Sequence, residues 1–483
     1  MLEDIISERK KKLRNLKEKG IDPYPVQSKR TALAGEILSS FSGYKKSSEK
    51  FYLTGRIRSL RDQGKIVFSD LEDFSGKIQI IFRKDDLKEF ELLKKNLDIG
   101  DFVQVAGKAL MTKSGQKSVD VLEAKILVKS LRPLPKDFYG IEDIELRLRK
   151  RYLDSIFNEK VRELFVKKSA FWNAVRAFLM KAGFLEVDTP VLEETPGGAE
   201  AEPFKTHYNA LNEDFYLRIS LEIALKKMLV GGFEKVFEIG RVFRNEGIDA
   251  EHLQDYTECE FYWAYSDYRE LMKFVERLYK FVIKQTVGSL TTIFGGNKIN
   301  WGKKWQTSDY CELFKKATGL DATTATRDAL FKKAHELKLY VEASAGKGRV
   351  IDLIFRKTVK PSLIQPTFLI NPPVFVEPLA KRSPINSLVV ERFQVMAGGT
   401  ELGKGFSEAN DPLDQRERFE EQMKLRAQGD REAQRLDENF LEALEYGMPP
   451  AAGFGFSERL FAVLMDKPIR ETVFFPPMKH KGS

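Results

Sequence analysis

The stretch YTECEFYW (residues 256–263) contains side chains that could bind a charged ligand. Side chains alternate between the two faces of a β-strand, so one face would carry two carboxylates between two phenol rings: Tyr256, Glu258, Glu260 and Tyr262. The other face would be apolar and would pack in a core. The acidic face suits a cationic ligand that also has a flat group for stacking, whereas a solvated surface strand is the alternative interpretation.

The polar loop before this stretch offers groups that could hold a nucleotide. It follows a second strand-like run, EKVFEI (234–239), so a hairpin is expected. Arg244 is a planar cation that can bind phosphate or carboxylate oxygens with two hydrogen bonds. Glu246 could accept a hydrogen bond from the amino group of a base, and His252 could contact phosphates. Because the sequence contains no GxxxxGK[ST] motif, these residues predict a nucleoside triphosphate site without a P-loop.

The composition excludes several classes of protein. No run approaches the roughly 18 apolar residues of a membrane span, and the N-terminus lacks the apolar segment of a secretory signal. The two cysteines, Cys259 and Cys311, form no ligand-like pair, so no disulfide framework is expected and a cytoplasmic location is predicted. The net charge of +9 fits a polyanionic partner, and residues 8–19 contain seven basic and two acidic side chains.

The 483 residues allow about three domains by the usual length rule. Between residues 51 and 130, five strand-like runs have one helical segment between the third and fourth, which is the order of an OB-type barrel. After this, strands alternate with helices, including a long helix that ends at Gly183 and a charged helical run over 411–447. The expected organisation is a basic helix and linker (1–50), the barrel (51–130), a connector (131–150) and a larger domain (151–483) with an inserted subdomain around 288–350.

Several segments in combination resemble the class II aminoacyl-tRNA synthetases, and specifically the bacterial-type lysyl-tRNA synthetases, over nearly the whole chain. GFLEVDTPVL (183–192) is similar to motif 1, residues 242–265 to motif 2, and GFGFSERL (453–460) to motif 3. PGGAEAEPFKTHYNAL (196–211) and GTELGKGFSEAND (399–411) are similar to segments that separate the lysine enzymes from their aspartate and asparagine relatives. The HIGH and KMSKS signatures of class I synthetases are absent.

This resemblance implies an α+β protein, with an N-terminal five-stranded OB-fold barrel that binds the anticodon and a catalytic domain built on an antiparallel sheet flanked by helices. The implied reaction activates L-lysine with ATP, releases pyrophosphate and transfers lysine to the 3′ end of tRNA(Lys). The substrate carboxylate is the nucleophile, so the protein needs none. The implied partners are ATP, Mg²⁺, L-lysine, tRNA(Lys) and a second copy of the chain in a homodimer, with Pro190 at the interface, and no membrane.

The resemblance also implies roles for individual residues. Arg244 and Arg459 would be the catalytic cations. The ATP site would consist of Arg244, Glu246, His252, Tyr256, Glu401 and Arg459, with Glu401 also holding the metal. The lysine site would consist of Gly198, Glu222, Arg244, Glu260, Tyr262, Lys404, Phe406 and Glu408. Within it, Gly198 and Glu222 take the α-amine, Phe406 the aliphatic stem, and Glu260, Tyr262 and Glu408 the ε-ammonium. The anticodon would meet Phe68, Gln79 and Gln116.

Five positions depart from the family pattern and indicate a divergent branch. Gln394 replaces a second metal-binding Glu, Lys404 an Asn near the substrate carboxylate, and Gln116 a Glu at the anticodon. Glu202 stands where an Arg is common, and motif 3 is one residue short. Gln394 and the shortened motif 3 favour an alternative hypothesis, a nucleic-acid-binding protein with a catalytically weakened synthetase-like domain.

The sequence argues against two further alternatives. An aspartate- or asparagine-specific enzyme would need a cationic side-chain pocket, which Glu260 and Glu408 oppose. An enzyme that lysylates a protein would resemble the catalytic domain alone, which the barrel at 51–130 opposes.

Overall fold

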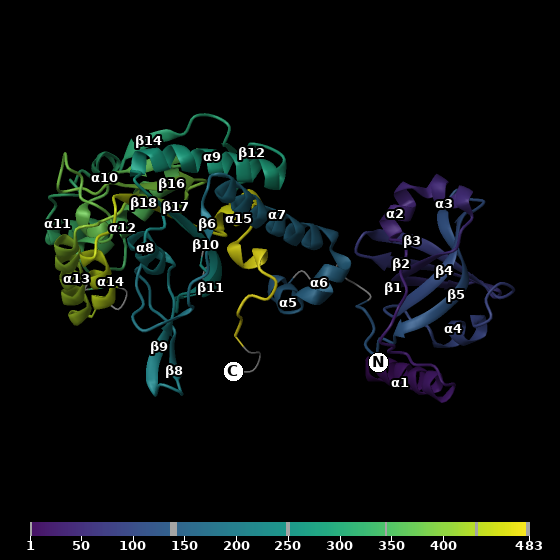
Figure 1. Ribbon diagram of the computed structural model, residues 1–483. Coiled ribbons are helices and arrows are strands. Elements are labelled where there is room, and N and C mark those ends of the chain that lie inside the picture. The colour runs from purple at the N-terminus through teal and green to yellow at the C-terminus, as the bar shows by residue number, and fades with distance from the viewer. Residues whose placement is uncertain (1, 136–142, 248–251, 343–344, 430–432, 480–483) are drawn as a thin grey trace. The chain divides into compact units, whose positions relative to one another are not determined.

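The computed structural model describes residues 2–135, 143–247, 252–342, 345–429 and 433–479 (Figure 1). The chain forms two compact units, residues 1–140 and 141–483. Each unit has its own hydrophobic core. No helix among the described residues is long and apolar enough to cross a membrane.

The first unit is a closed five-stranded barrel with strand order β1-β2-β3-β5-β4, as the sequence predicted. Burial alternates along β2, where Val67 and Leu71 point into the barrel core. A helix lies between the third and fourth strands of the chain order, which is also as predicted. The elements are α1 (Leu2–Glu18), α2 (Ala34–Ser39), α3 (Phe41–Ser47), β1 (Phe51–Asp62), β2 (Ile66–Asp73), β3 (Gly76–Arg83), α4 (Phe90–Asn96), β4 (Phe102–Met111) and β5 (Lys117–Val128).

The basic helix α1 is anchored to this unit by a buried arginine. Arg9 donates hydrogen bonds to the backbone oxygens of Ile99, Ser130 and Arg132 at 2.9, 3.1 and 3.2 Å. Ile6 and Leu16 are buried on the same helix. Lys12 is half-buried and pairs with Asp98 at 2.7 Å. The other basic residues of the helix are exposed: Lys10, Lys11, Arg14 and Lys17.

The second unit is built on an eight-stranded sheet with order β14-β15-β16-β17-β18-β11-β10-β6. The six strands from β15 to β10 are antiparallel, as predicted, but each edge strand pairs in parallel with its neighbour, so the sheet is mixed. Its strands are β6 (Leu185–Glu186), β10 (Lys235–Phe243), β11 (Asp255–Ala264), β14 (Gln306–Asp309), β15 (Thr367–Ile370), β16 (Arg392–Ala397), β17 (Thr400–Ser407) and β18 (Ala451–Ser457).

The remaining elements of the second unit surround this sheet or form small hairpins. The α-helices are α5 (Ile144–Arg149), α6 (Arg151–Phe157), α7 (Glu159–Lys181), α8 (Glu222–Val230), α9 (Tyr268–Val287), α10 (Tyr310–Thr318), α11 (Arg327–Glu336), α12 (Lys347–Thr358), α13 (Pro412–Ala427), α14 (Glu438–Glu445) and α15 (Arg459–Leu464). The short strands and 3₁₀ turns are β7 (Leu192–Glu193), β8 (Lys205–Tyr208), β9 (Glu213–Leu217), β12 (Thr291–Phe294), β13 (Asn297–Asn300), η2 (Lys360–Ser362), η3 (Val374–Val376) and η4 (Ile469–Thr472).

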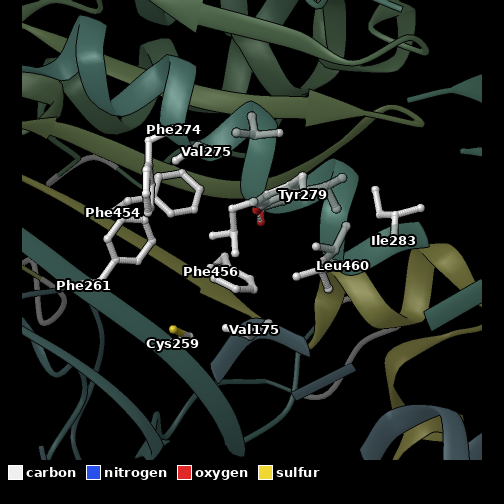
Figure 2. Packing of buried hydrophobic residues seen from close by; sticks show 14 of the residues in the cluster. Val175, Cys259, Phe261, Phe274, Val275, Tyr279, Ile283, Phe454, Phe456 and Leu460 are labelled. Carbon is white, nitrogen blue, oxygen red and sulfur yellow. Dashed lines mark hydrogen bonds between the residues drawn. The ribbon is translucent and has the colours of Figure 1, made fainter. Parts of the chain in front are cut away.

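Helix α9 covers one face of the sheet and encloses the main core. Asp267 begins the helix by accepting hydrogen bonds from the backbone N–H groups of Arg269 and Glu270, and Gly288 ends it in a left-handed conformation (φ +74°). Figure 2 shows Phe261, Phe454 and Phe456 from the sheet meeting Val275 and Tyr279 from α9. These side chains cluster with Cys259, so the apolar face of β11 lies in the core as predicted.

The segment 288–350, predicted as an inserted subdomain, contributes one strand to the central sheet. Its strand β14 pairs with β15, with Gln306 opposite Thr367, and so forms an edge of the central sheet. Helices α10, α11 and α12 then share a small core of their own that includes Phe314, Leu330 and Ile351. The charged run predicted over 411–447 contains two helices, α13 and α14.

Candidate active site

Strand register brings the predicted ligand-binding residues into two neighbouring rows across three strands, β11, β18 and β17. In one row Tyr262 of β11 lies opposite Gly453 of β18, which lies opposite Phe406 of β17. In the next row Glu260 lies opposite Gly455, which lies opposite Lys404. Residues that are 144 positions apart in the sequence, such as Tyr262 and Phe406, therefore form one surface, on the sheet face opposite α9.

Glycine forms the floor of this surface where larger side chains would collide. A Cβ atom on Gly453 would overlap the Tyr262 ring and Glu408 Oε1. At Gly198, whose φ of +83° already favours glycine, a Cβ atom would lie 2.9 Å from Glu222 Cβ. The side chains above these positions therefore lie directly against the backbone.

Three carboxylates form a buried group that we term the acidic pocket: Glu222, Glu260 and Glu408. They are 4%, 4% and 1% exposed. Glu260 accepts hydrogen bonds from Ser220 Oγ, Leu221 N–H and the Tyr262 hydroxyl at 2.6, 2.8 and 2.7 Å. Glu408 Oε1 has no hydrogen-bond partner among the described residues. The pocket thus contains one carboxylate bound tightly within the protein and another, Glu408, neither of whose buried oxygens has a hydrogen-bond partner among the described residues.

Lys226 joins two of these carboxylates, and the sequence analysis missed it. Its Nζ lies 2.5 Å from Glu222 Oε1 and 2.5 Å from Glu408 Oε2. Burial raises the pKa of Glu222 to about 7, although Lys226 acts to lower it, and burial raises the pKa of Glu408 well above its usual value against the same cation. The spacing of Glu222 and Lys226, four residues apart on one helix, is the signal that could have revealed the pair.

Arg244 lies at the end of β10, beside the pocket. Its Nε donates to the Ile219 carbonyl at 3.1 Å, its guanidinium lies 5.5 Å from the centre of the Tyr256 ring, and its Nη2 lies 3.7 Å from Glu258 Oε2. Burial raises the pKa of Glu258 to about 7, although Arg244 opposes the shift. Glu258 and Glu260 lie on the same face of β11, as predicted. The Glu258 carboxylate has the Arg244 guanidinium as its neighbour.

Lys404 has an ionic partner inside the protein. Its Nζ donates to Glu377 Oε2 at 3.0 Å, and Arg392 Nε lies 3.6 Å from the same oxygen. Burial acts to raise the pKa of Glu377, but Lys404 and Arg392 outweigh it and hold that pKa below its usual value. Sequence analysis did not identify Glu377, which lies 27 residues from Lys404.

Glu401 and Arg459 meet where motif 3 crosses the sheet. Gln394 Nε2 donates to Glu401 Oε2 at 2.7 Å, and Arg459 Nη1 donates to the Glu401 carbonyl at 3.4 Å. Within the described residues, no group of three or more His, Cys, Asp or Glu side chains could hold a metal. A single carboxylate such as Glu401 still fits Mg²⁺, which proteins often bind through one or two carboxylates together with substrate phosphates.

The predicted nucleotide residues Glu246 and His252 flank residues 248–251, which lie outside the described part of the chain. Both side chains are half-buried.

In the barrel, Phe68 lies on the outer face of β2. It is half-exposed, whereas its neighbours Val67 and Ser69 are buried, so it is not a core phenylalanine. Gln79, on the adjacent strand β3, accepts a hydrogen bond from Ser118 Oγ at 2.9 Å. Gln116 is exposed between β4 and β5, and its backbone N–H donates to Thr112 Oγ1 at 2.9 Å.

Comparison with known proteins gives matches along both units. Residues 143–479 match the family model for tRNA synthetases class II (D, K and N), and residues 51–134 match the model for the OB-fold nucleic acid binding domain. A lysine–tRNA ligase of Moorella thermoacetica is 43% identical over 483 residues, covering 99% of this chain and 98% of its own length. Similar proteins from Halalkalibacterium halodurans (41% identity; 100% and 98% covered) and Roseiflexus castenholzii (42%; 99% and 99%) carry the same name.

Proposed function

We propose the residue roles below on the premise that this chain belongs to the class II tRNA synthetases (D, K and N). Its activity is that of an ATP-dependent lysine–tRNA ligase, since relatives so named align along nearly all of it. It activates L-lysine with ATP and transfers the lysyl group to tRNA. This supersedes the hypothesis of a catalytically weakened, nucleic-acid-binding protein.

The observation that carries the assignment of the lysine site is the acidic pocket beside Arg244. A buried ammonium is costly unless charges and hydrogen bonds replace its hydration. Glu408, Glu260 and Tyr262 would bind the ε-ammonium, with Glu408 dominant because its Oε1 has no partner among the described residues. Glu222 and the backbone at Gly198 would bind the α-amine, and the buried Phe406 ring would lie against the aliphatic stem.

In the first step, a carboxylate oxygen of lysine attacks the α-phosphorus of ATP and pyrophosphate leaves. Arg244 would bind the substrate carboxylate and the α-phosphate together, so that it positions both and stabilises the negative charge that develops at phosphorus. Lys404 would add a second cation near the substrate carboxylate, shared with Glu377.

For ATP, Tyr256 and Arg459 would lie on opposite faces of the adenine, Glu246 would accept from its amino group, and His252 would contact the outer phosphates. Arg459 would also reach the γ-phosphate. Glu401 would hold Mg²⁺, which when bound neutralises phosphate charge.

In the barrel, Phe68 would stack on an anticodon base, and Gln79 and Gln116 would form hydrogen bonds to the anticodon. The working form would be a homodimer.

The test is amino-acid-dependent ATP–pyrophosphate exchange with each of the twenty amino acids, followed by charging of tRNA. Lysine alone should support rapid exchange, and the protein should then charge tRNA(Lys). Exchange that depends on aspartate or asparagine, or an absence of exchange in a folded sample, would contradict the assignment.

A further inference from the structure

Lys226 lies on α8 with its side chain 0% exposed, inside the pocket proposed for the substrate. Its ammonium lies 2.5 Å from one oxygen of Glu222 and 2.5 Å from one oxygen of Glu408. The rings of Phe406 and Phe440 lie 5.3 Å and 5.9 Å away, within the range of cation–π attraction. A protein cation thus bridges the two carboxylates proposed for the two ends of the substrate.

The bridge joins the Lys226 ammonium to one oxygen of Glu222 and one oxygen of Glu408. Lys226 contacts Glu222 Oε1 and Glu408 Oε2. Glu408 Oε1, which lies against Gly453, has no hydrogen-bond partner among the residues that the structure describes. A substrate ammonium could therefore bind Glu408 on this oxygen without displacing Lys226.

Charge balance also favours a Lys226 ammonium that stays between Glu222 and Glu408 when substrate binds. The acidic pocket contains three carboxylates and one ammonium, so it carries two net negative charges when all four groups are ionised. Substrate lysine brings two ammonium groups, and its carboxylate is assigned to Arg244. Without Lys226, two substrate ammoniums would face three buried carboxylates, and an uncompensated buried charge is costly.

The groups around Lys226 come from several elements. Glu222 lies on α8, Glu260 and Tyr262 on β11, and Glu408 directly after β17. Glu377, at the end of η3, and Lys404, on β17, act on the pocket at longer range and neutralise each other. Phe406 and Phe440 are apolar, so the cation on which Glu222 and Glu408 both depend is Lys226.

We infer that Lys226 is a positioning residue for lysine recognition. Its ammonium stays between Glu222 and Glu408 while substrate binds, favours the ionised form of both carboxylates against the effect of burial, and holds their second oxygens toward the α-amine and the ε-ammonium. This inference rests on the proposed lysine site. It assigns no contact with the reacting atoms to Lys226.

Lysine-dependent exchange by the full chain tests the inference, measured from about pH 6.5 to about pH 9 for the parent, Lys226→Met and Lys226→Gln. Without the ammonium, the pKa values of the two carboxylates should rise, so they ionise only at higher pH. We expect KM for lysine to rise at least about 30-fold at neutral pH, while KM for ATP is unchanged. The rise of kcat/KM for lysine with pH should also move to higher pH.

The matched control is Lys227→Met, because Lys227 is the adjacent lysine and its Nζ donates to Asn439 on the protein surface. This variant should match the parent. If Lys226→Met does not fold, Lys226→Gln decides, since it keeps hydrogen-bond donors and removes the charge. A KM for lysine within about threefold of the parent, or a pH-independent loss that affects lysine and ATP equally, would overturn the inference. If the parent itself shows no lysine-dependent exchange, the proposed function fails instead.

Discussion

The two oxygens of the Glu408 carboxylate have different surroundings. One oxygen contacts Lys226 and the other faces the floor formed by Gly453. Glu260, by contrast, already accepts three hydrogen bonds from the protein. The two acids were predicted together from the sequence, but the structure separates them into one that shapes the pocket and one with an oxygen free of protein hydrogen bonds.

We therefore expect Glu408→Gln to reduce lysine activation strongly, since it keeps the shape and removes the charge. Losing one partner of a buried ion pair costs roughly 3–5 kcal/mol, or on the order of a hundred- to a few-thousand-fold in kcat/KM. KM for ATP should hardly change, and Glu445→Gln on the exposed side of α14 should be silent. Lysine activation within about threefold of the parent would place the ammonium elsewhere.

The pair of Lys404 and Glu377 makes a prediction about stability and pH. Glu377 is 5% exposed and has a depressed pKa, so its charge contributes stability that is present above its unfolded pKa and is lost as the pH falls through its folded pKa. Lys404→Asn removes the cation and should raise that pKa. Because the Lys404 side chain is 37% exposed, solvent screening reduces the expected cost to about 1–2 kcal/mol.

Urea unfolding should show this loss at pH near 7 and a smaller one at pH near 4, where Glu377 is closer to neutral. Glu377→Gln added to Lys404→Asn should not restore the stability, because it leaves the buried Arg392 guanidinium without its carboxylate. KM for lysine should be nearly unchanged or mildly raised in Lys404→Asn. A large gain in lysine affinity would show that Lys404 faces the ε-ammonium.

Sequence analysis predicted the acidic face of β11 because alternation along one strand is a local property. It missed Lys226 and Glu377 for different reasons. Lys226 stands in an ordinary helical pattern, and only folding shows that α8 turns it toward Glu408, 182 positions further on. Glu377 lies in an irregular segment, where no periodicity indicates which way a side chain points.

Among the elements, the barrel strands agree with prediction, and burial alternates along β2 and along most of β1. Strand β14 has the sequence QTSD, which no pattern distinguishes from a loop, and pairing with β15 alone makes it part of the sheet. The parallel pairing of the two edge strands could not be predicted for a similar reason. Strand direction depends on how distant segments connect, and a two-residue strand such as β6 carries no signal of it.

At this scale we expect Phe68→Ala, on the outer face of β2, to weaken tRNA charging and spare lysine-dependent exchange. Stacking on an aromatic side chain is worth roughly 1–3 kcal/mol per base, so KM for tRNA should rise about 5- to 150-fold. Phe74→Ala is the matched control, because Phe74 is 77% exposed in the turn between β2 and β3. Equal losses of charging and exchange would contradict an anticodon role for this face.

For the whole molecule, the stretch around motif 1 leaves large apolar side chains exposed. Val166 and Met180 on α7 are 52% and 57% exposed, and Leu185, Val191 and Leu192 are 49%, 38% and 42% exposed. Beside them, Thr189 donates from its backbone and hydroxyl to Glu238 at 3.0 and 2.7 Å, and Arg218 lies 2.7 Å from the other oxygen of that carboxylate. A buried network therefore fixes the backbone of a segment whose neighbouring apolar side chains face outward, which is typical of a surface that packs against another subunit.

We therefore expect sedimentation equilibrium to give a mass twice the 55.5 kDa of the chain. Leu192→Asp would place a charge in that interface and should shift the protein toward monomer at concentrations where the parent stays dimeric. Exchange activity should fall in proportion to the dimer lost, because motif 1 joins the interface to β10 through Glu238. Leu413→Asp, at a side chain 77% exposed on α13, controls for an added surface charge. A parent that is an active monomer, or a Leu192→Asp variant as dimeric and as active as the parent, would show that this surface does not join two copies.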